Sequence, residues 1–572
     1  MLYLLKANGI RKVVASPGST NITLVTSMQH DPFFEIYSCV DERSAAYMAC
    51  GMAAESGEPV VISCTGATAP RNYFPALTEA YYRKLPIVAI TATQDLANVG
   101  QLIPQVTDRS LRPKDVVVCS EHLQFIEAKS DEWNVTLKVN RALRALKKNG
   151  GGPVHLNLET RYSKDFSVRK LPETRVIKYI DYNTPFIDLP KGRIGIFVGS
   201  HKPMEEELTR AIDSFCASYN AVVLCDQTSN YKGKYRTFHS LIAAQDDYVS
   251  ELLRFDLLIN IGEMSGNYVQ MGKILSKQQW RVCEDGETRD PFRNLTAVFE
   301  MSELAFFAHY SSLATENSDS LLKAFKKEYK TCLEQFPEIP FSNIWMAHQL
   351  ASRLPKYSRL HVAILNSLRS WNFFEVDPSI YGFANTGGFG IEGGISSVVG
   401  ASLISPNNLF FCIVGDLAFF YDLNSMGNRH IGNNLRILLV NNGRGGEFRI
   451  PYTVSYQLGS ETDEYIAAAR HFGNKSRDLV KHYAQDLGYE YLSASNKEEF
   501  KAVIERFVDP NITDHSIIFE AFTDVEGENS AIWAAHHILC DKSFVAKRKL
   551  KAAIKSLLPD CAIQKIKKIL GK

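Results

Sequence analysis

The sequence predicts an α/β protein made of three doubly wound parallel-sheet domains. Short apolar runs of strand length recur along most of the chain, and segments long enough for a helix lie between them. Polar or glycine-rich turns follow directly after several of these runs. Strands that are joined by helices and buried on both faces form parallel sheets, and ligands collect at the carboxyl ends of such strands.

The composition is that of a globular chain. The 572 residues are 45% hydrophobic and 22% charged, and the formal net charge of +1 gives no general preference for nucleic acid. The eleven cysteines show no CxxC or other metal-type spacing, and several lie in apolar runs, which indicates reduced core cysteines of a cytoplasmic protein. The chain opens with no secretory signal and carries no run approaching about 18 apolar residues, so we expect a soluble protein.

Residues 1–165 are predicted to form the first domain. The segment Ser16–Ser19 stops its first strand, and Glu42 opens a helix rich in small residues after its second. A carboxylate at that point is often only a helix cap, so position alone leaves Glu42 open between a capping role and a ligand-binding role. The expected strands are 12–15, 34–40, 60–64, 87–90 and 154–158.

Residues 166–340 are predicted to form a linker and a central domain. The linker, 166–189, is polar and contains Pro172 and Pro185. The strand pattern then resumes, and no motif there indicates a flavin or a regulatory ligand, so we expect a structural role. The expected strands are 194–198, 221–224, 257–261 and 295–298.

Residues 341–535 are predicted to form the third domain, with strands at 360–365, 409–414 and 435–440. Asp416 follows the second of these strands and Asn442 follows the third. Parallel strands joined by one helix end at the same edge of a sheet, so these two side chains should emerge side by side. A carboxylate and an amide oxygen suit Mg²⁺. The alternative is an ordinary crossover with a capping aspartate and a turn asparagine.

These positions resemble the thiamine diphosphate (ThDP) enzyme family. Gly415-Asp416, the spacing of about 26 residues and the ending Asn441-Asn442 are similar to the metal motif of that family. In the first domain, Ser16–Ser19, Asp41–Arg43 and Thr65–Asn72 resemble its pyrimidine-binding domain. The resemblance implies three sheet domains of the ThDP-enzyme type, with 1–165 binding the pyrimidine, 166–340 in the middle and 341–535 binding diphosphate and magnesium.

The resemblance also implies roles for single residues. Glu42 would be catalytic, because its hydrogen bond to N1′ of the aminopyrimidine favours the tautomer that deprotonates the thiazolium. Asp416, Asn442 and the backbone carbonyl of Arg444 would hold Mg²⁺, and Ile391 would force the bent shape of the cofactor. The other expected cofactor contacts are Gly387, Gly388, Phe389, Gly415, Leu417 and Phe448.

Within that family the sequence is most similar to the SEPHCHC synthases of menaquinone biosynthesis. The segments Tyr421–Asn424, Asn366–Leu368 and Asp285–Pro291 agree with this group, and so does Phe448. SEPHCHC synthases decarboxylate 2-oxoglutarate and add the resulting carbanion to isochorismate. The resemblance therefore implies a decarboxylase and transferase that forms a carbon–carbon bond.

Several arginines of that group are replaced in this chain. Thr20, Gln94, Trp371 and Thr386 stand where the family has arginine. Each lost paired contact with a carboxylate can be worth about 1.5–3 kcal/mol, so we expect a changed donor or acceptor. Arg369 lies two residues before Trp371 and is not expected to reach the same place, whereas the new arginines Arg444 and Arg449 could rebuild part of the anion binding. The predicted substrate residues are Ser19, Thr20, Gln94, Gln101, Ser367 and Thr386.

Three alternatives stay open beside this hypothesis. One is a true SEPHCHC synthase. Another is a catalytically silent ThDP-fold protein, against which the presence of Glu42, Ile391, Asp416 and Asn442 speaks. The third is an unrelated nucleotide-binding α/β protein, against which the absence of a GxxxxGK[ST] motif speaks.

The resemblance implies a homodimer or homotetramer with sites between subunits, acting on a 2-oxo acid and an acceptor. Residues 536–572 form a basic tail, with ten Lys or Arg and two Asp from Asp541 onward. Two amphipathic helices there would suit an anionic membrane surface or an acidic partner protein. The alternative is a pair of helices packed on the body with solvated lysines.

Overall fold

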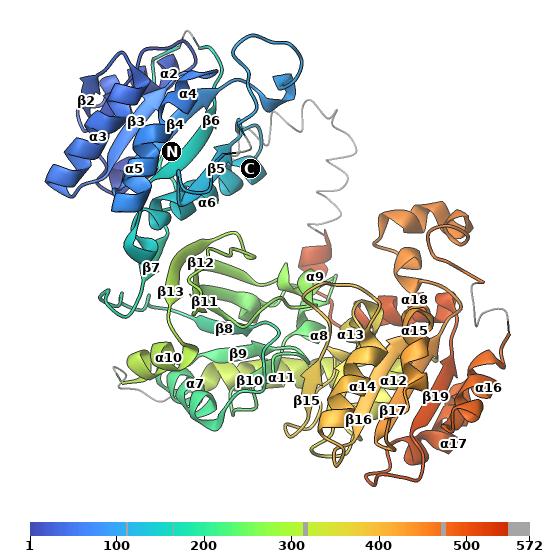
Figure 1. The fold of residues 1–572 in the computed structure, drawn as a ribbon. Helices are drawn as coiled ribbons and strands as arrows, with labels where there is room; N and C mark the ends of the chain where they lie inside the picture. The colour runs from blue at the N-terminus through green and yellow to red at the C-terminus, as the bar shows by residue number, and fades with distance from the viewer. Residues whose placement is uncertain (110–111, 164, 313–318, 471–475, 547–572) are drawn as a thin grey trace. The chain divides into compact units, whose positions relative to one another are not determined.

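Parallel sheets organise the chain, and the predicted α/β class is confirmed (Figure 1). The computed structural model describes residues 1–109, 112–163, 165–312, 319–470 and 476–546. The contacts within the chain divide it into two compact units. The first unit comprises residues 1–183 and 286–298, and the second comprises 184–285 and 299–572.

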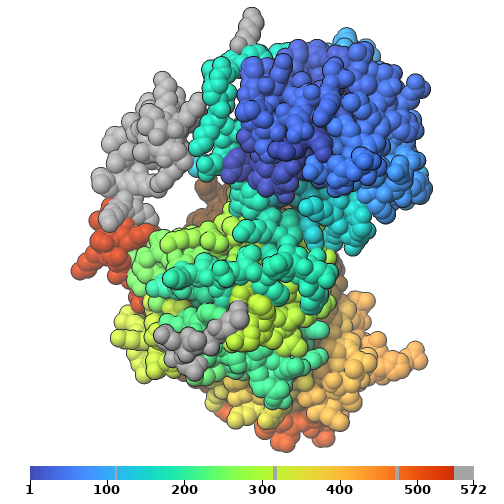
Figure 2. All heavy atoms as spheres, turned by 90° about the vertical axis from the view of Figure 1, so that its left-hand side faces the viewer, coloured from blue at the N-terminus to red at the C-terminus, as the bar shows by residue number. Residues whose placement is uncertain are grey.

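The first unit contains a six-stranded sheet in the order β2-β1-β3-β4-β6-β5, and its strands run parallel. Figure 2 shows this unit, in blue to cyan, as a close-packed body. Its strands are β1 Lys12–Ala15, β2 Glu35–Ser38, β3 Val60–Cys64, β4 Ile87–Thr93, β5 Cys119–Leu123 and β6 Val154–Glu159. Its helices are α1 Leu2–Ala7, α2 Ile22–Gln29, α3 Glu42–Ser56, α4 Ala69–Asn72, α5 Phe74–Arg83 and α6 Lys129–Ala145, with short 3₁₀ segments η1 Leu96–Asn98 and η2 Lys148–Gly150.

Both faces of this sheet are buried, because the side chains of each strand alternate between two cores. Val61 and Val88 pack with α1, α2 and α6 on one face. Val60 and Ile62 pack with α3 and α5 on the other. The small residues of α3 let that helix lie close to the sheet, and Gly57 ends it in a left-handed conformation, with φ of 68°. The doubly wound arrangement therefore follows from the apolar strands and the small-residue helix.

The second unit contains the strands of a second parallel sheet in the order β10-β9-β8-β11-β12. They are β8 Ile194–Val198, β9 Val222–Cys225, β10 Arg236–Phe238, β11 Arg254–Ile261 and β12 Leu275–Cys283. The segment predicted as a linker contains a short strand, β7 Lys178–Ile180, and β13 Leu295–Glu300 crosses the boundary between the units. The accompanying helices are α7 Glu206–Tyr219, α8 Ser240–Ala243, α9 Tyr268–Met271, α10 Glu303–Ser311 and α11 Ser320–Glu334, with η3 Glu251–Leu253.

The third sheet also belongs to the second unit and has six parallel strands in the order β15-β14-β16-β17-β19-β18. The strands are β14 Arg359–Val362, β15 Tyr381–Phe383, β16 Phe410–Gly415, β17 Leu435–Asn441, β18 Glu490–Ala494 and β19 Ile517–Phe522. The helices are α12 Asn343–Leu350, α13 Asn366–Trp371, α14 Gly394–Ile404, α15 Asp416–Asp422, α16 Leu479–Asp486, α17 Lys497–Phe507 and α18 Val525–Ala535. The 3₁₀ segments are η4 Leu423–Gly427, η5 Gly446–Arg449 and η6 Val454–Thr462.

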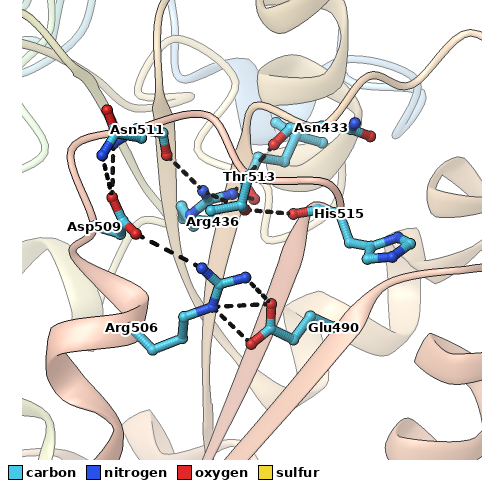
Figure 3. A network of polar contacts seen from close by, with 9 residues as sticks. Asn433, Arg436, Glu490, Arg506, Asp509, Asn511, Thr513 and His515 are labelled. Carbon is cyan, nitrogen blue, oxygen red and sulfur yellow. Dashed lines mark hydrogen bonds and ion pairs between the residues drawn. The ribbon is translucent and has the colours of Figure 1, made fainter.

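A buried arginine fixes the amino end of β17 (Figure 3). Arg436 is 0% exposed and donates hydrogen bonds to the backbone oxygens of Asn433 and Asn511, at 3.2 and 3.1 Å. It also donates to Oγ1 of Thr513 at 2.8 Å. These bonds hold the turn before β19 against the sheet.

A second arginine lies beside the first in the same view (Figure 3). Arg506 of α17 donates through Nε and Nη2 to the carboxylate of Glu490, and Nη1 lies 3.6 Å from Oδ2 of Asp509. Its side chain is 40% exposed, so this ion pair is a surface contact. The network joins strands and loops at the edge opposite the carboxyl ends of β16 and β17.

Within the described ranges, no helix has the length and apolar character needed to cross a membrane. Of the predicted basic tail, residues 536–546 are described. Residues 547–572 lie outside the described residues, so the two amphipathic helices stay a prediction.

Candidate functional site

Asp416 lies where β16 passes into α15, at the carboxyl edge of the third sheet. Its side chain is buried, at 2% exposure of the residue. One carboxylate oxygen accepts from the backbone N–H of Leu417 at 2.7 Å. The other accepts from the backbone N–H of Gly443, also at 2.7 Å, and Gly443 follows β17. The carboxylate therefore joins the ends of two neighbouring strands, which pair in register at Gly415 and Val440.

The two asparagines after β17 have different partners. Asn441 is buried and donates to Oε1 of Glu520 at 2.7 Å, which holds it in the protein interior. Asn442 lies in the turn, where its Oδ1 accepts from the backbone N–H of Arg444 at 3.2 Å. The aspartate, the Asn442 amide and the backbone carbonyls of this turn are hard oxygen donors. This donor chemistry fits Mg²⁺, with further positions left for water or phosphate oxygens.

The glycine-rich segment before α14 exposes its backbone. A Cβ at Gly387 or at Gly388 would meet nothing within 4 Å, and the same is true of Gly415. Phe389, which follows Gly388, has φ of 54°, and its ring lies 5.8 Å from that of Tyr268, edge to face. Open space beside main-chain groups is what a segment needs to approach a flat ring closely. Ile391 is half-buried and packs against the core of the third sheet.

The predicted substrate residues of the second unit are buried. Ser367 is 3% exposed and accepts a hydrogen bond from Nδ2 of Asn343 at 3.2 Å. Thr386 is 4% exposed and packs beside Gly266. Trp371, which replaces a family arginine, is fully buried. All three positions therefore hold buried, uncharged side chains.

Arg369 is held inside the second unit. Its Nη1 donates to Glu447 at 2.5 Å, and its Nη2 donates to the Tyr268 hydroxyl at 2.7 Å. The side chain is 8% exposed. Its hydrogen bond with Glu447 raises the pKa of Arg369 against the opposing effect of burial, so the guanidinium stays charged. Glu447 and Tyr268 carried no signal in the sequence, because they lie 78 and 101 residues from Arg369.

Arg444 and Arg449 are both paired with Asp463. Each donates through Nη1 to Oδ1 of Asp463, and each distance is 2.7 Å. Their side chains are 27% and 20% exposed, so both guanidinium groups reach solvent. Asp463 was also missed from the sequence, since no motif contains it.

In the first unit, two adjacent carboxylates at the start of α3 have different roles. Asp41 caps the helix, with its Oδ1 accepting from the backbone N–H of Ser44 at 2.8 Å. Glu42 is half-buried, and its Oε2 accepts from Nδ2 of Asn72 at 3.1 Å. The capping role that was left open for Glu42 therefore belongs to its neighbour.

Thr20 is buried in the turn between β1 and α2. Its Oγ1 lies 2.8 Å from Oγ1 of Thr65 and accepts from the backbone N–H of Gly66 at 3.0 Å. Ser19 and Gln94 are half-buried, and Gln101 is exposed. The structure thus brings Thr20 and the turn after β3 together, and the substrate roles of these four residues stay predictions.

Comparisons with known proteins identify relatives of this chain. Residues 1–111 match the family model described as thiamine pyrophosphate enzyme, N-terminal TPP binding domain. The chain is 30% identical over 566 residues to the 2-succinyl-5-enolpyruvyl-6-hydroxy-3-cyclohexene-1-carboxylate synthase of Bacteroides thetaiotaomicron, covering 95% of this chain and 98% of that protein. The synthase of the same name from Phocaeicola vulgatus is 28% identical over 573 residues, again with 95% and 98% covered.

One solved structure among the matches is a thiamine diphosphate-dependent 4-hydroxybenzoylformate decarboxylase of Rhodococcus jostii RHA1. It is 15% identical, with a TM-score of 0.39, and the match covers 91% of this chain and 98% of that one.

Proposed function

The chain belongs to the thiamine diphosphate enzyme family, and on that premise we propose that it decarboxylates a 2-oxo acid and joins the resulting carbanion to an acceptor. It is related at about 30% identity to the SEPHCHC synthases, that is, the 2-succinyl-5-enolpyruvyl-6-hydroxy-3-cyclohexene-1-carboxylate synthases. The observation that carries the proposal is the carboxylate of Asp416 bridging to the turn that holds Asn442. That arrangement supports a magnesium ion at the edge of the third sheet.

We propose that different residues of this chain bind the metal ion, the diphosphate and the aminopyrimidine of the cofactor. Asp416, Asn442 and the carbonyl of Arg444 would hold Mg²⁺ and, through it, the diphosphate. The open backbone of Gly387 and Gly388 would lie against the aminopyrimidine, with Ile391 below. When bound, ThDP supplies a carbon nucleophile for a 2-oxo acid and accepts the electron pair left by CO₂. Glu42 would hold a proton at the pyrimidine nitrogen N1′.

The choice of substrate distinguishes two candidate functions. The buried threonines and tryptophan at family arginine positions favour a changed donor or acceptor. The internal pairing of Arg369 adds to this, because a guanidinium already bonded to Glu447 and Tyr268 is poorly placed to bind a substrate carboxylate. The full-length similarity to named SEPHCHC synthases favours the second candidate, the 2-oxoglutarate and isochorismate reaction.

A two-step assay separates these candidates from a silent ThDP-fold protein. CO₂ release is first measured with ThDP, Mg²⁺ and a panel of 2-oxo acids, and product formation is then measured with 2-oxoglutarate and isochorismate. We expect CO₂ release from at least one acid and slow formation of SEPHCHC. Efficient SEPHCHC formation would favour the second candidate, whereas cofactor binding without any CO₂ release would indicate a silent protein.

We further propose that the active form is at least a homodimer in the cytoplasm. Family members place the catalytic glutamate of one subunit beside the diphosphate site of another. In this chain Glu42 belongs to the first unit, whereas Asp416 and Asn442 belong to the second. A dimer would therefore carry two equivalent sites.

A further inference from the structure

Two guanidinium groups converge on one carboxylate oxygen close to the proposed metal turn. Arg444 lies in the turn after β17, and Arg449 ends η5. Both donate to Oδ1 of Asp463 at 2.7 Å, and all three side chains are between 20% and 27% exposed. The two guanidinium groups are thus arranged to bind a carboxylate, and in this structure the carboxylate that they bind is that of Asp463.

The cluster of Arg444, Arg449 and Asp463 keeps a net positive charge and unused hydrogen-bond donors. Two arginines and one aspartate sum to a net charge of +1. Each guanidinium carries five N–H groups, and the contact with Asp463 uses one nitrogen of each. Nε of Arg444 is buried and has no hydrogen-bond partner. Unused guanidinium donors are best satisfied by a planar oxyanion.

The third arginine of this region provides an internal contrast. Arg369 is 8% exposed and is already bonded to Glu447 and the Tyr268 hydroxyl. A ligand could reach it only by breaking these contacts. Of the three, Arg444 and Arg449 are therefore the pair that a ligand from solvent can reach.

The surroundings also suit a short carbon chain. Phe448 directly precedes Arg449 in the chain and is 37% exposed. An exposed aromatic side chain next to a cationic residue in the chain is compatible with an aliphatic chain that ends in a carboxylate.

We propose that Arg444 and Arg449 form a carboxylate-binding site for the substrate, and that Asp463 weakens this site as its built-in competitor. The inference rests on the proposed function, because it assigns the residues that replace the missing family arginines. Asp463 lowers the charge of the pair from +2 to +1, so it limits the affinity for anions. A diphosphate oxygen of the cofactor could engage the same donors, and the test separates the two sources.

Titration calorimetry of the full-length protein loaded with ThDP and Mg²⁺ tests the proposal. The probe is glutarate, a dicarboxylate that cannot be decarboxylated by this chemistry, and neutral glutaramide is the ligand control. We expect Arg449→Gln to weaken glutarate binding by about tenfold or more, since a charge-assisted contact is lost. Asp463→Asn should tighten it several-fold. Arg353→Gln removes a surface ion pair with Glu505 elsewhere in the unit and should change nothing.

Each other outcome has a defined meaning. If Asp463 only joins η5 to η6, Asp463→Asn lowers the melting temperature and leaves glutarate affinity unchanged, which overturns the proposal. If Arg449→Gln weakens ThDP binding and not glutarate binding, the anion is the diphosphate, and the substrate site is excluded. Arg449→Lys, which keeps the charge, replaces Arg449→Gln if that variant unfolds. A wild-type protein that binds ThDP but no glutarate also overturns the inference, whereas one that binds no ThDP contradicts the proposed function itself.

Discussion

At the scale of residues, the start of α3 shows how two adjacent carboxylates take different tasks. Asp41 satisfies the backbone N–H of Ser44, while Glu42 contacts the side chain of Asn72. The sequence alone could not decide which of the two caps the helix, because both types of side chain occur there. The observed bond leaves Glu42 available for a ligand.

Replacing Glu42 by glutamine should remove catalysis and preserve cofactor binding. The amide cannot exchange a proton with the pyrimidine nitrogen, so we expect the turnover number to fall by about 10²–10⁴. The measurement is CO₂ release beside a ThDP titration of the same variant. Asp41→Asn is the control, since asparagine is an equally good cap, and its activity should stay near that of the wild type. Full activity of Glu42→Gln would exclude Glu42 as the proton-handling group.

The contacts of the arginines near the site could not be predicted from the sequence, whereas the position of the proposed metal ligands could. Asp416 and Asn442 were predictable as neighbours, because parallel strands deliver their carboxyl ends to one edge. The contacts of Arg369 and the convergence of Arg444 and Arg449 on Asp463 were not. They depend on how η5 and η6 pack after the motif, and no local pattern encodes a contact between residues so far apart.

At the scale of elements, many of the strands were predicted, but buried β19 and the more polar strands β5 and β12 were missed. The runs 60–64, 194–198 and 435–440 correspond to β3, β8 and β17 within a residue. β5 and β12 were not predicted, because each mixes apolar residues with charged or polar ones. Apolar content marks a strand only where both of its faces are buried.

One boundary near the site differs from the prediction for a local reason. The apolar run 360–365 continues past β14, which ends at Val362, because Leu365 has φ of 68° and α13 then begins at Asn366. Ile364 is buried in this turn although it is not part of a strand, and its apolar side chain made the predicted strand too long. The helix that joins β16 to β17 begins directly at Asp416, with no loop after the strand, and η4 follows it.

Arg436 is expected to be a stability residue of the third sheet. Arg436→Met fills the core but leaves the backbone oxygens of Asn433 and Asn511 without hydrogen-bond donors. We therefore expect the free energy of unfolding to fall by about 2–4 kcal/mol. Urea unfolding measures this change. Arg506→Gln, at the exposed neighbour, should cost about 1 kcal/mol or less. Equal losses for both variants would contradict the assigned roles.

His155 in β6 should make the first unit sensitive to acid. Its ring lies between the hydroxyls of Thr91 and Ser120, at 2.7 and 2.8 Å. Burial, reinforced by Arg109 and Arg112, lowers its pKa to about 3. The unfolded chain binds this proton near pH 6.5 and the folded chain does not, so acidification favours unfolding.

The contribution of His155 is therefore fully present above about pH 6.5 and is lost as the pH falls toward 3. We expect His155→Gln to show a shallower loss of unfolding free energy between pH 7 and 5 than the wild type. Urea unfolding at several pH values checks this. The exposed His430 gives the matched control, and His430→Gln should keep the wild-type slope. An unchanged slope for His155→Gln would show that the pKa of its ring is the same in the folded and the unfolded chain.

At the scale of the whole molecule, the proposed dimer makes a complementation test possible. Glu42→Gln and Asp416→Asn chains are co-expressed with different tags, and the mixed dimer is purified through both. One of its two sites would combine both substitutions and the other would carry neither. We expect about half of the wild-type activity per dimer. Activity no higher than that of the separate variants would show that Glu42 and Asp416 act within one chain.

The central claim is that this chain binds ThDP through Mg²⁺ held by Asp416 and Asn442. Calorimetric titration of ThDP, with and without Mg²⁺, into the wild-type protein and into Asp416→Asn tests it most directly. Asp486→Asn, on an exposed carboxylate, is the control. We predict saturable, magnesium-dependent binding to the wild type and to the control, and a loss of affinity of about 100-fold or more in Asp416→Asn. Binding that needs no magnesium, or that survives in Asp416→Asn, would contradict the account.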